Sequence, residues 1–206
     1  MRVECQQVGV AAEQTVLLPA TSFVLEAPGL VALTGANGAG KTTLLKTLAG
    51  RVLPTDGECL VEGKHPYEFA PVFRAAVASL IDTPPMARDM TLAEQLALVE
   101  ASWAGSRAEA FRGAEQTLEQ LTIAELGERF PYELSAGQLQ LFAIGLTLSR
   151  PFRLLLLDEP ERHLDGDRVQ ALLSILQARV SGGALVLTAT HRSEIVENTS
   201  ERLHLG

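Results

Sequence analysis

The chain has 206 residues, of which 47% are hydrophobic and 20% are charged, and its formal net charge is -8 at pH 7. This composition is that of a globular protein and excludes a disordered chain. Binding to a phosphate backbone depends on clustered Lys and Arg, and no such cluster is present. We therefore expect no nucleic-acid partner.

No stretch approaches the roughly 18 consecutive apolar residues of a membrane span. The N-terminal sequence MRVECQQVGV also lacks a basic segment followed by an apolar core. A cytosolic chain is the expectation. Cys5 and Cys59 fall in expected strands, and their spacing matches neither a metal site nor a redox motif, so both are expected to be small buried hydrophobic residues without a functional role.

In chain order, residues 1–34 are predicted to form short strands joined by turns. The last of these, over residues 30–33, suits a buried strand. Leu44, Leu45 and Leu48 then recur at helical spacing until Gly50, which is a C-cap signal. The sequence therefore predicts a strand, a glycine-rich loop and a helix.

This loop, residues 35–43 (GANGAGKTT), matches the phosphate-binding pattern G-x-x-x-x-G-K-[ST]. Glycines allow backbone N–H groups to surround phosphate oxygens, and the helix N-terminus adds partial positive charge. Lys41 is predicted to reach the β- and γ-phosphates, and the Thr42 hydroxyl to bind Mg2+. The candidate nucleotide-binding residues of this phosphate loop are Gly35, Ala36, Asn37, Gly38, Ala39, Gly40, Lys41, Thr42 and Thr43.

After the helix, residues 54–57 read as a turn, residues 58–62 as a short strand, and residues 77–81 as a core strand that stops at Asp82. From Thr91 the pattern becomes helical. Helix starts of the S/T-x-x-E type occur at Thr91 and Ser106, and in the second helix Phe111, Ala114, Leu118 and Leu121 are predicted to share one face.

Residues 134–140 (LSAGQLQ) give Ser135 and Gln138 the same capping-box spacing at the start of an apolar helix. Residues 154–157 are four leucines, as in a strand buried on both faces, and they run into Asp158 and Glu159. An amphipathic helix is predicted from Val169 to Val180, followed by a buried strand over residues 184–190 that runs into His191.

Alternating strands and helices predict a parallel or mixed sheet, whose ligands collect at the carboxyl ends of the strands. The phosphate loop, the acidic pair and His191 each follow a strand in this way. Mg2+ requires oxygen ligands, so Asp158 is predicted to hold the metal. Glu159 is then placed to orient or deprotonate the water that attacks the γ-phosphate.

These motifs together resemble the nucleotide-binding subunits of ATP-binding cassette (ABC) transporters. Residues 35–43 resemble the family's Walker A, residues 154–160 its Walker B, and residues 134–138 its signature LSGGQ. Leu164-Asp165 resembles the D-loop, and His191 the switch histidine that contacts the γ-phosphate. The resemblance covers nearly the whole chain, in the family's order.

The resemblance implies an α/β fold of the ABC ATPase type among P-loop NTPases: one domain with a mixed-sheet core lobe (residues 1–85 and 151–206) and an inserted helical subdomain (residues 86–150). It implies an ATP hydrolase with ATP and Mg2+ as cofactors and Lys41, Glu159 and His191 as catalytic residues. Ser135, Gly137 and Gln138 of one chain are expected to cover the nucleotide of a second chain, in a homo- or heterodimer. Transmembrane permease subunits are the other implied partners, which would hold the chain on the inner face of the cell membrane.

Some positions depart from the family pattern. Asp82 falls where the family has the Q-loop glutamine, and it is a candidate third metal ligand. Ala136 replaces a signature glycine, and Leu141 stands where arginine is frequent. No aromatic residue occurs near residues 10–12 to stack on adenine, and Phe23, the nearest, is expected in the core; weak stacking predicts tolerance of GTP.

Two other function classes compete. A soluble ABC ATPase that acts outside transport is one alternative, although DNA-repair types carry a long coiled coil between Walker A and the signature, and translation types carry two cassettes. A nucleotide kinase or GTPase is the other, but it would need a base-reading motif such as N-K-x-D, which the sequence lacks.

Overall fold

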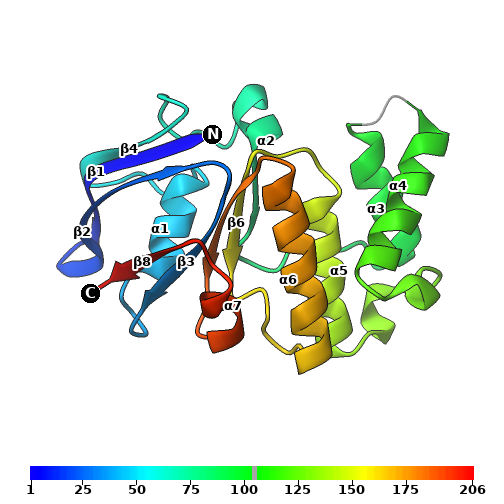
Figure 1. The fold of residues 1–206 in the computed structure, drawn as a ribbon. Coiled ribbons are helices and arrows are strands. Elements are labelled where there is room, and N and C mark those ends of the chain that lie inside the picture. The colour runs from blue at the N-terminus through cyan, green and yellow to red at the C-terminus, as the bar shows by residue number, and fades with distance from the viewer. Residues whose placement is uncertain (104–105) are drawn as a thin grey trace. The chain divides into compact units, whose positions relative to one another are not determined.

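The computed structural model describes residues 1–103 and 106–206. The chain divides into two compact units (Figure 1). The first unit comprises Met1–Ile81, Phe152–Glu159 and Leu176–Gly206, and the second comprises Asp82–Pro151 and Pro160–Ile175. Across the described ranges, no helix is long and apolar enough to cross a membrane.

The first unit contains a three-stranded antiparallel sheet of order β2-β1-β4. Its strands are β1 (Arg2–Ala12), β2 (Thr15–Glu26) and β4 (Asp56–Val61). The first two form a hairpin that is longer than the short strands predicted from the sequence. Register shifts interrupt the hairpin at several points, so no single alternation runs along either strand.

A five-stranded parallel sheet forms the rest of the first unit's frame, in the order β5-β6-β7-β3-β8. Its strands are β5 (Val77–Leu80), β6 (Leu154–Asp158), β7 (Leu185–Ala189), β3 (Gly29–Gly35) and β8 (Glu201–Leu205). The apolar runs become the three central strands, as predicted, because both faces of a parallel sheet are covered. The register sets Asp158 beside Ala189, and Ala189 beside Leu33, so these strands end at one edge.

Three short elements of this unit are not predicted from the sequence: β8, α2 (Pro71–Ala76) and α7 (Ser193–Glu197). Each spans only five or six residues, too few for a helical or strand period to be read from the sequence.

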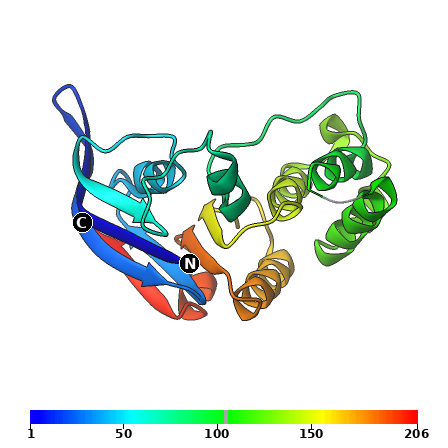
Figure 2. The same cartoon turned by 90° about the horizontal axis from the view of Figure 1, so that it is seen from above.

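Helix α1 (Lys41–Leu48) lies between the two sheets, since it contacts β3 and β6 of one and β2 and β4 of the other (Figure 2). Its three leucines are fully buried. The helix ends at Ala49, and Gly50 follows with φ of 74°, the left-handed conformation expected after a helix. Helix α1 thereby fixes the phosphate loop to both sheets.

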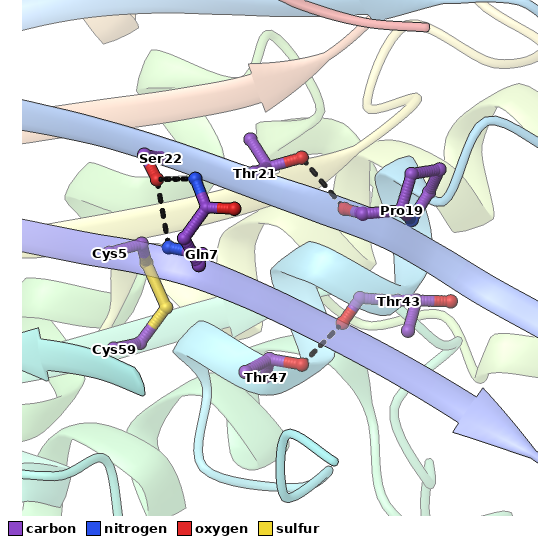
Figure 3. The surroundings of a disulfide bond; sticks show 8 residues. All are labelled: Cys5, Gln7, Pro19, Thr21, Ser22, Thr43, Thr47 and Cys59. Carbon is purple, nitrogen blue, oxygen red and sulfur yellow. Dashed lines mark hydrogen bonds between the residues drawn. A yellow bond between two sulfur atoms is a disulfide. The ribbon is translucent and has the colours of Figure 1, made fainter. Parts of the chain in front are cut away.

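Cys5 and Cys59 form a disulfide between β1 and β4 (Figure 3). They are direct partners in the antiparallel register, with Cα atoms 4.1 Å apart, and each is 2% exposed. The expectation that they serve only as small buried hydrophobic residues is therefore wrong. The pairing joins residues 54 positions apart, so it follows from strand register and not from any local cysteine motif.

Beside the disulfide, Gln7 adopts a positive φ of 46° in β1. The Ser22 hydroxyl accepts hydrogen bonds from the Gln7 backbone N–H at 2.8 Å and from its side-chain amide at 2.9 Å (Figure 3). Ser22 thus supplies the partner that the interrupted strand ladder leaves missing at this point.

The second unit is helical, with α3 (Leu92–Ala101), α4 (Arg107–Gln120) and α5 (Ala136–Leu148) packed on one another. It also holds the short helices η1 (Ala124–Leu126) and η2 (Pro131–Glu133), and α6 (Gly166–Ser181) begins in it. The hydroxyls of Thr91, Ser106 and Ser135 each accept the backbone N–H three residues on, so all three predicted helix starts are confirmed.

The buried face of α4 differs in one residue from the prediction. Ala110, Ala114, Leu118 and Leu121 are buried, but Phe111 is 38% exposed and lies under the Arg107 guanidinium, 5.5 Å from the ring centroid. The placement of Phe111 on the buried face is wrong, because the face centres on Ala110 and Ala114 and leaves Phe111 at its margin.

Candidate active site

The phosphate loop connects the end of β3 to the start of α1 and depends on glycine at more than one position. Gly35, Gly38 and Gly40 have φ values of 145°, 82° and 96°. A Cβ atom on Gly40 would lie only 2.7 Å from the Leu17 carbonyl oxygen and 2.9 Å from the Leu18 side chain. The loop therefore excludes a side chain at Gly40 by both its conformation and its contact with β2.

The Lys41 ammonium is folded back over this loop. Its Nζ donates hydrogen bonds to the carbonyl oxygens of Gly35 at 2.8 Å and Ala36 at 3.0 Å, and the residue is 8% exposed. An ammonium group has three donors, so one N–H remains for a phosphate oxygen while the other two hold the loop.

The hydroxyl of Thr42 donates a hydrogen bond of 2.6 Å to Oδ2 of Asp158. The two residues come from the first turn of α1 and the last position of β6. A hydroxyl and a carboxylate side by side are the hard oxygen ligands that Mg2+ prefers, with water and phosphate supplying the other positions. Among the residues described, no group of three or more His, Cys, Asp or Glu is placed to hold a metal ion.

Glu159 and His191 also meet at the carboxyl edge of the parallel sheet. His191 Nε2 lies 3.8 Å from Glu159 Oε1, and both side chains are about half exposed. The Glu159 backbone has a φ of 46° and donates its N–H to the Ala189 carbonyl at 2.9 Å. A non-glycine residue in this conformation is held there by its surroundings, which is common where side-chain placement serves a site.

In the second unit, Ser135 and Gln138 form the predicted capping box at the N-terminus of α5. The Ser135 hydroxyl accepts the Gln138 N–H, and the Gln138 side-chain oxygen accepts the Ser135 N–H at 2.9 Å. A Cβ on Gly137 would lie 2.7 Å from the His163 carbonyl oxygen, so only glycine fits there. Leu141 is 1% exposed, which shows that this departure from arginine serves the helical core.

The first unit therefore brings together the phosphate loop, Lys41, Thr42, Asp158, Glu159 and His191, whereas Ser135, Gly137, Gln138 and Asp82 belong to the second unit. The role of Asp82 as a metal ligand stays a prediction. Phe23 is partly buried and packs against the hydrophobic core, as expected.

Two contacts of these motifs were not found from the sequence. Leu17 and Leu18 of β2 contact the phosphate loop at Gly40, and the His163 carbonyl contacts Gly137. Neither carries a sequence signal, because both are backbone or aliphatic contacts set by tertiary packing.

The family model for ABC transporters matches residues 18–162. An "Uncharacterized ABC transporter ATP-binding protein" of Haemophilus influenzae is 30% identical over 201 residues, which are 94% of this chain and 76% of that protein. The "Spermidine/putrescine import ATP-binding protein PotA" of Nitrosospira multiformis is 34% identical over 88% of this chain. The "Fe(3+) ions import ATP-binding protein FbpC" of Agrobacterium fabrum is 33% identical over 90%. The chain spans about half of these last two relatives, 50% and 53% of their lengths.

Solved structures of ATP-binding cassettes have the same fold as this chain. One described as "Structure of ATP binding subunit of ABC transporter" has a TM-score of 0.86 at 25% identity and covers all of this chain and 86% of its own. A dimeric post-hydrolysis state of an ATP-binding cassette bound to ADP and Pi has a TM-score of 0.87 at 20% identity, with 98% of this chain and 94% of its own covered. The chain therefore belongs to the ABC transporter family, as an ATP-binding subunit with the α/β fold of the ABC ATPases.

Proposed function

We propose that the chain binds and hydrolyses ATP and powers a membrane transporter through ATP-dependent pairing with a second ABC ATPase chain. The observation that carries this proposal is the shared edge of the parallel sheet. There the phosphate loop with Lys41, the Thr42–Asp158 pair and the Glu159–His191 pair lie at the ends of neighbouring strands. Phosphate binding, metal binding and water activation are the three tasks of nucleotide hydrolysis, and each has its residues here.

In the first task, the backbone N–H groups of the phosphate loop and the ammonium of Lys41 hold the β- and γ-phosphates. Thr42 and Asp158 would hold Mg2+, with Asp82 as a further oxygen ligand. The metal, when bound, would neutralise the charge that develops on the phosphate oxygens.

In the third task, water activation, Glu159 orients the attacking water and accepts its proton. His191 Nε2 lies 3.8 Å from the Glu159 carboxylate, and we propose that the imidazole also contacts the γ-phosphate. The pair would align water and phosphate for an in-line attack.

Closure of the site requires a second chain. Ser135, Gly137 and Gln138 sit at the N-terminus of the 13-residue helix α5, where backbone N–H groups and the helix dipole form a second anion site. These residues and the phosphate loop are in different units of one chain. We propose that they cover the γ-phosphate bound by the partner, and the description of one structural neighbour as dimeric supports the pairing of two chains.

Permease subunits are the proposed membrane partners, and the chain would lie on the inner face of the membrane through them. PotA and FbpC, named as import ATP-binding proteins, support transport over an ABC ATPase outside transport. Because a permease selects the cargo, the substrates in those names do not pass to this chain.

The direct test is Glu159→Gln. It should bind ATP, hydrolyse it at least about a hundredfold more slowly, and accumulate as an ATP-bound dimer in size-exclusion chromatography. Glu197→Gln, an exposed change on α7, is the matched control and should keep wild-type turnover. Unaltered turnover of Glu159→Gln would show that the base is elsewhere.

A further inference from the structure

Two aromatic rings lie immediately before the signature residues, in the second unit. Phe130 and Tyr132 are stacked, with ring centroids 5.5 Å apart and planes only 6° from parallel. Tyr132 is nonetheless 69% exposed, so its outer face is open to solvent. An exposed aromatic face beside a ligand-covering motif is suited to stacking on another ring.

The turn that carries Tyr132 is held rigidly. Pro131 is buried, and the Glu133 carboxylate accepts hydrogen bonds from the Phe130 N–H at 2.7 Å and from the Arg129 guanidinium at 3.1 Å. The Phe130 N–H, with a smaller contribution from Arg129, lowers the pKa of Glu133, so the carboxylate is charged at neutral pH. Tyr132 therefore presents its ring at a small entropic cost on binding.

The distance to the signature serine limits what this ring can reach. Tyr132 lies three positions before Ser135, which sets their Cα atoms at most about 10 Å apart. If Ser135 covers the γ-phosphate of a nucleotide on the partner chain, the phenol ring can extend along that nucleotide toward its ribose and base.

Among the residues that the structure describes, the stretch of β2 that contacts the phosphate loop carries no aromatic side chain. The β2 residues next to the phosphate loop are aliphatic: Val16 is 64% exposed, and Leu17 is 40% exposed with its carbonyl against Gly40. Phe23, farther along β2, packs against the core. If a base rests on this aliphatic surface, its other face remains available to an aromatic ring from a second chain.

We propose that Tyr132 of one chain stacks on the purine base of the ATP held by the second copy, and so selects for the base across the dimer. This rests on the proposed function, because it requires ATP bound between two chains. It adds a specificity-determining residue that lies outside the signature itself.

The test uses the full chain in the Glu159→Gln background, where dimers persist. Tyr132→Ala should raise the ATP concentration for half-maximal dimerisation about tenfold, since base–aromatic stacking contributes on that order. Tyr132→Phe should have the same ATP concentration for half-maximal dimerisation as the parent, because it keeps the aromatic ring. Tyr67→Ala, which removes a tyrosine 58% exposed on the first unit, is the control and should leave it unchanged.

Three further measurements distinguish a loss of base stacking from a loss of folded structure. The melting temperature of Tyr132→Ala should match the parent, and the preference for ATP over the pyrimidine nucleotide UTP should fall. The fluorescence of ethenoadenosine triphosphate should be quenched when the parent protein dimerises, but it should not be quenched when Tyr132→Ala dimerises. Unchanged half-saturation and nucleotide preference in Tyr132→Ala, with Ser135→Ala impaired, would overturn this inference and keep the proposed function. Absence of any ATP-dependent dimer would overturn both.

Discussion

Thr42 and Asp158 are 116 residues apart in the chain, and their side-chain oxygens are 2.6 Å apart in the fold. Thr42 lies where the phosphate loop enters α1, and Asp158 ends the strand β6. Their proximity arises because β3 and β6 both pair in parallel with β7, so that both strands end at the same edge. The chemistry proposed here depends on that edge.

Lys41→Ala should lower nucleotide affinity at least about 30-fold, because it removes a nearly buried charge that also holds the loop carbonyls. Lys46→Ala, on the same helix but in its last turn, is the control and should retain affinity. Titration with a fluorescent ATP analogue measures both. Equal nucleotide affinity in the two variants would contradict the proposal that this loop binds the phosphates of the nucleotide.

Gly137→Ala should weaken ATP-dependent dimerisation and lower stability by about 1–3 kcal/mol, since its Cβ would lie 2.7 Å from the His163 carbonyl. Gly166→Ala has open space around the new atom and should change neither property. Thermal melts and size-exclusion chromatography with ATP distinguish the two. A Gly137→Ala protein that melts and dimerises like wild type would show that the backbone at His163 shifts easily at this contact.

Asp82→Gln should preserve or raise the ATPase rate if Asp82 occupies the Q-loop position, since an amide still contacts metal and water without added negative charge. The steady-state rate and its dependence on Mg2+ measure this. A collapse of the rate would assign Asp82 a different role.

Reduction of the Cys5–Cys59 disulfide should destabilise the first unit. The bond closes a 54-residue separation that contains β2, β3, the phosphate loop and α1, and loops of that size contribute about 2–4 kcal/mol. A reductant should therefore lower the melting temperature by about 5–15 °C. The double variant Cys5→Ala and Cys59→Ala should melt at the lower temperature with or without reductant; a shift in that variant would mean that the reductant acts elsewhere.

The phosphate loop, the central strands and the helix starts were predictable because each depends on local chemistry. Glycines predict a loop with positive φ, an apolar run predicts a buried strand, and a Ser three residues before Gln predicts the start of a helix. The grouping of Asp158 with Thr42 also followed, from the rule that parallel strands end together.

Other features depend on tertiary pairing and carry no local signal. The disulfide requires the register of β1 on β4, and the exposure of Phe111 depends on which side of α4 meets its neighbours. The short strand β8 has too few residues for a period. The stacked rings of Phe130 and Tyr132 become visible only when the turn at Pro131 is formed.

The central claim is that each ATP site is completed by a second chain, and mixing two inactive variants tests it most directly. Lys41→Ala keeps an intact signature, and Ser135→Ala keeps an intact phosphate loop. If two copies of this chain pair, mixing equal amounts should restore roughly a quarter of the wild-type ATPase rate per chain, because half of the dimers are mixed and one of their two sites is complete. A mixture no more active than the two variants measured separately would contradict the shared site.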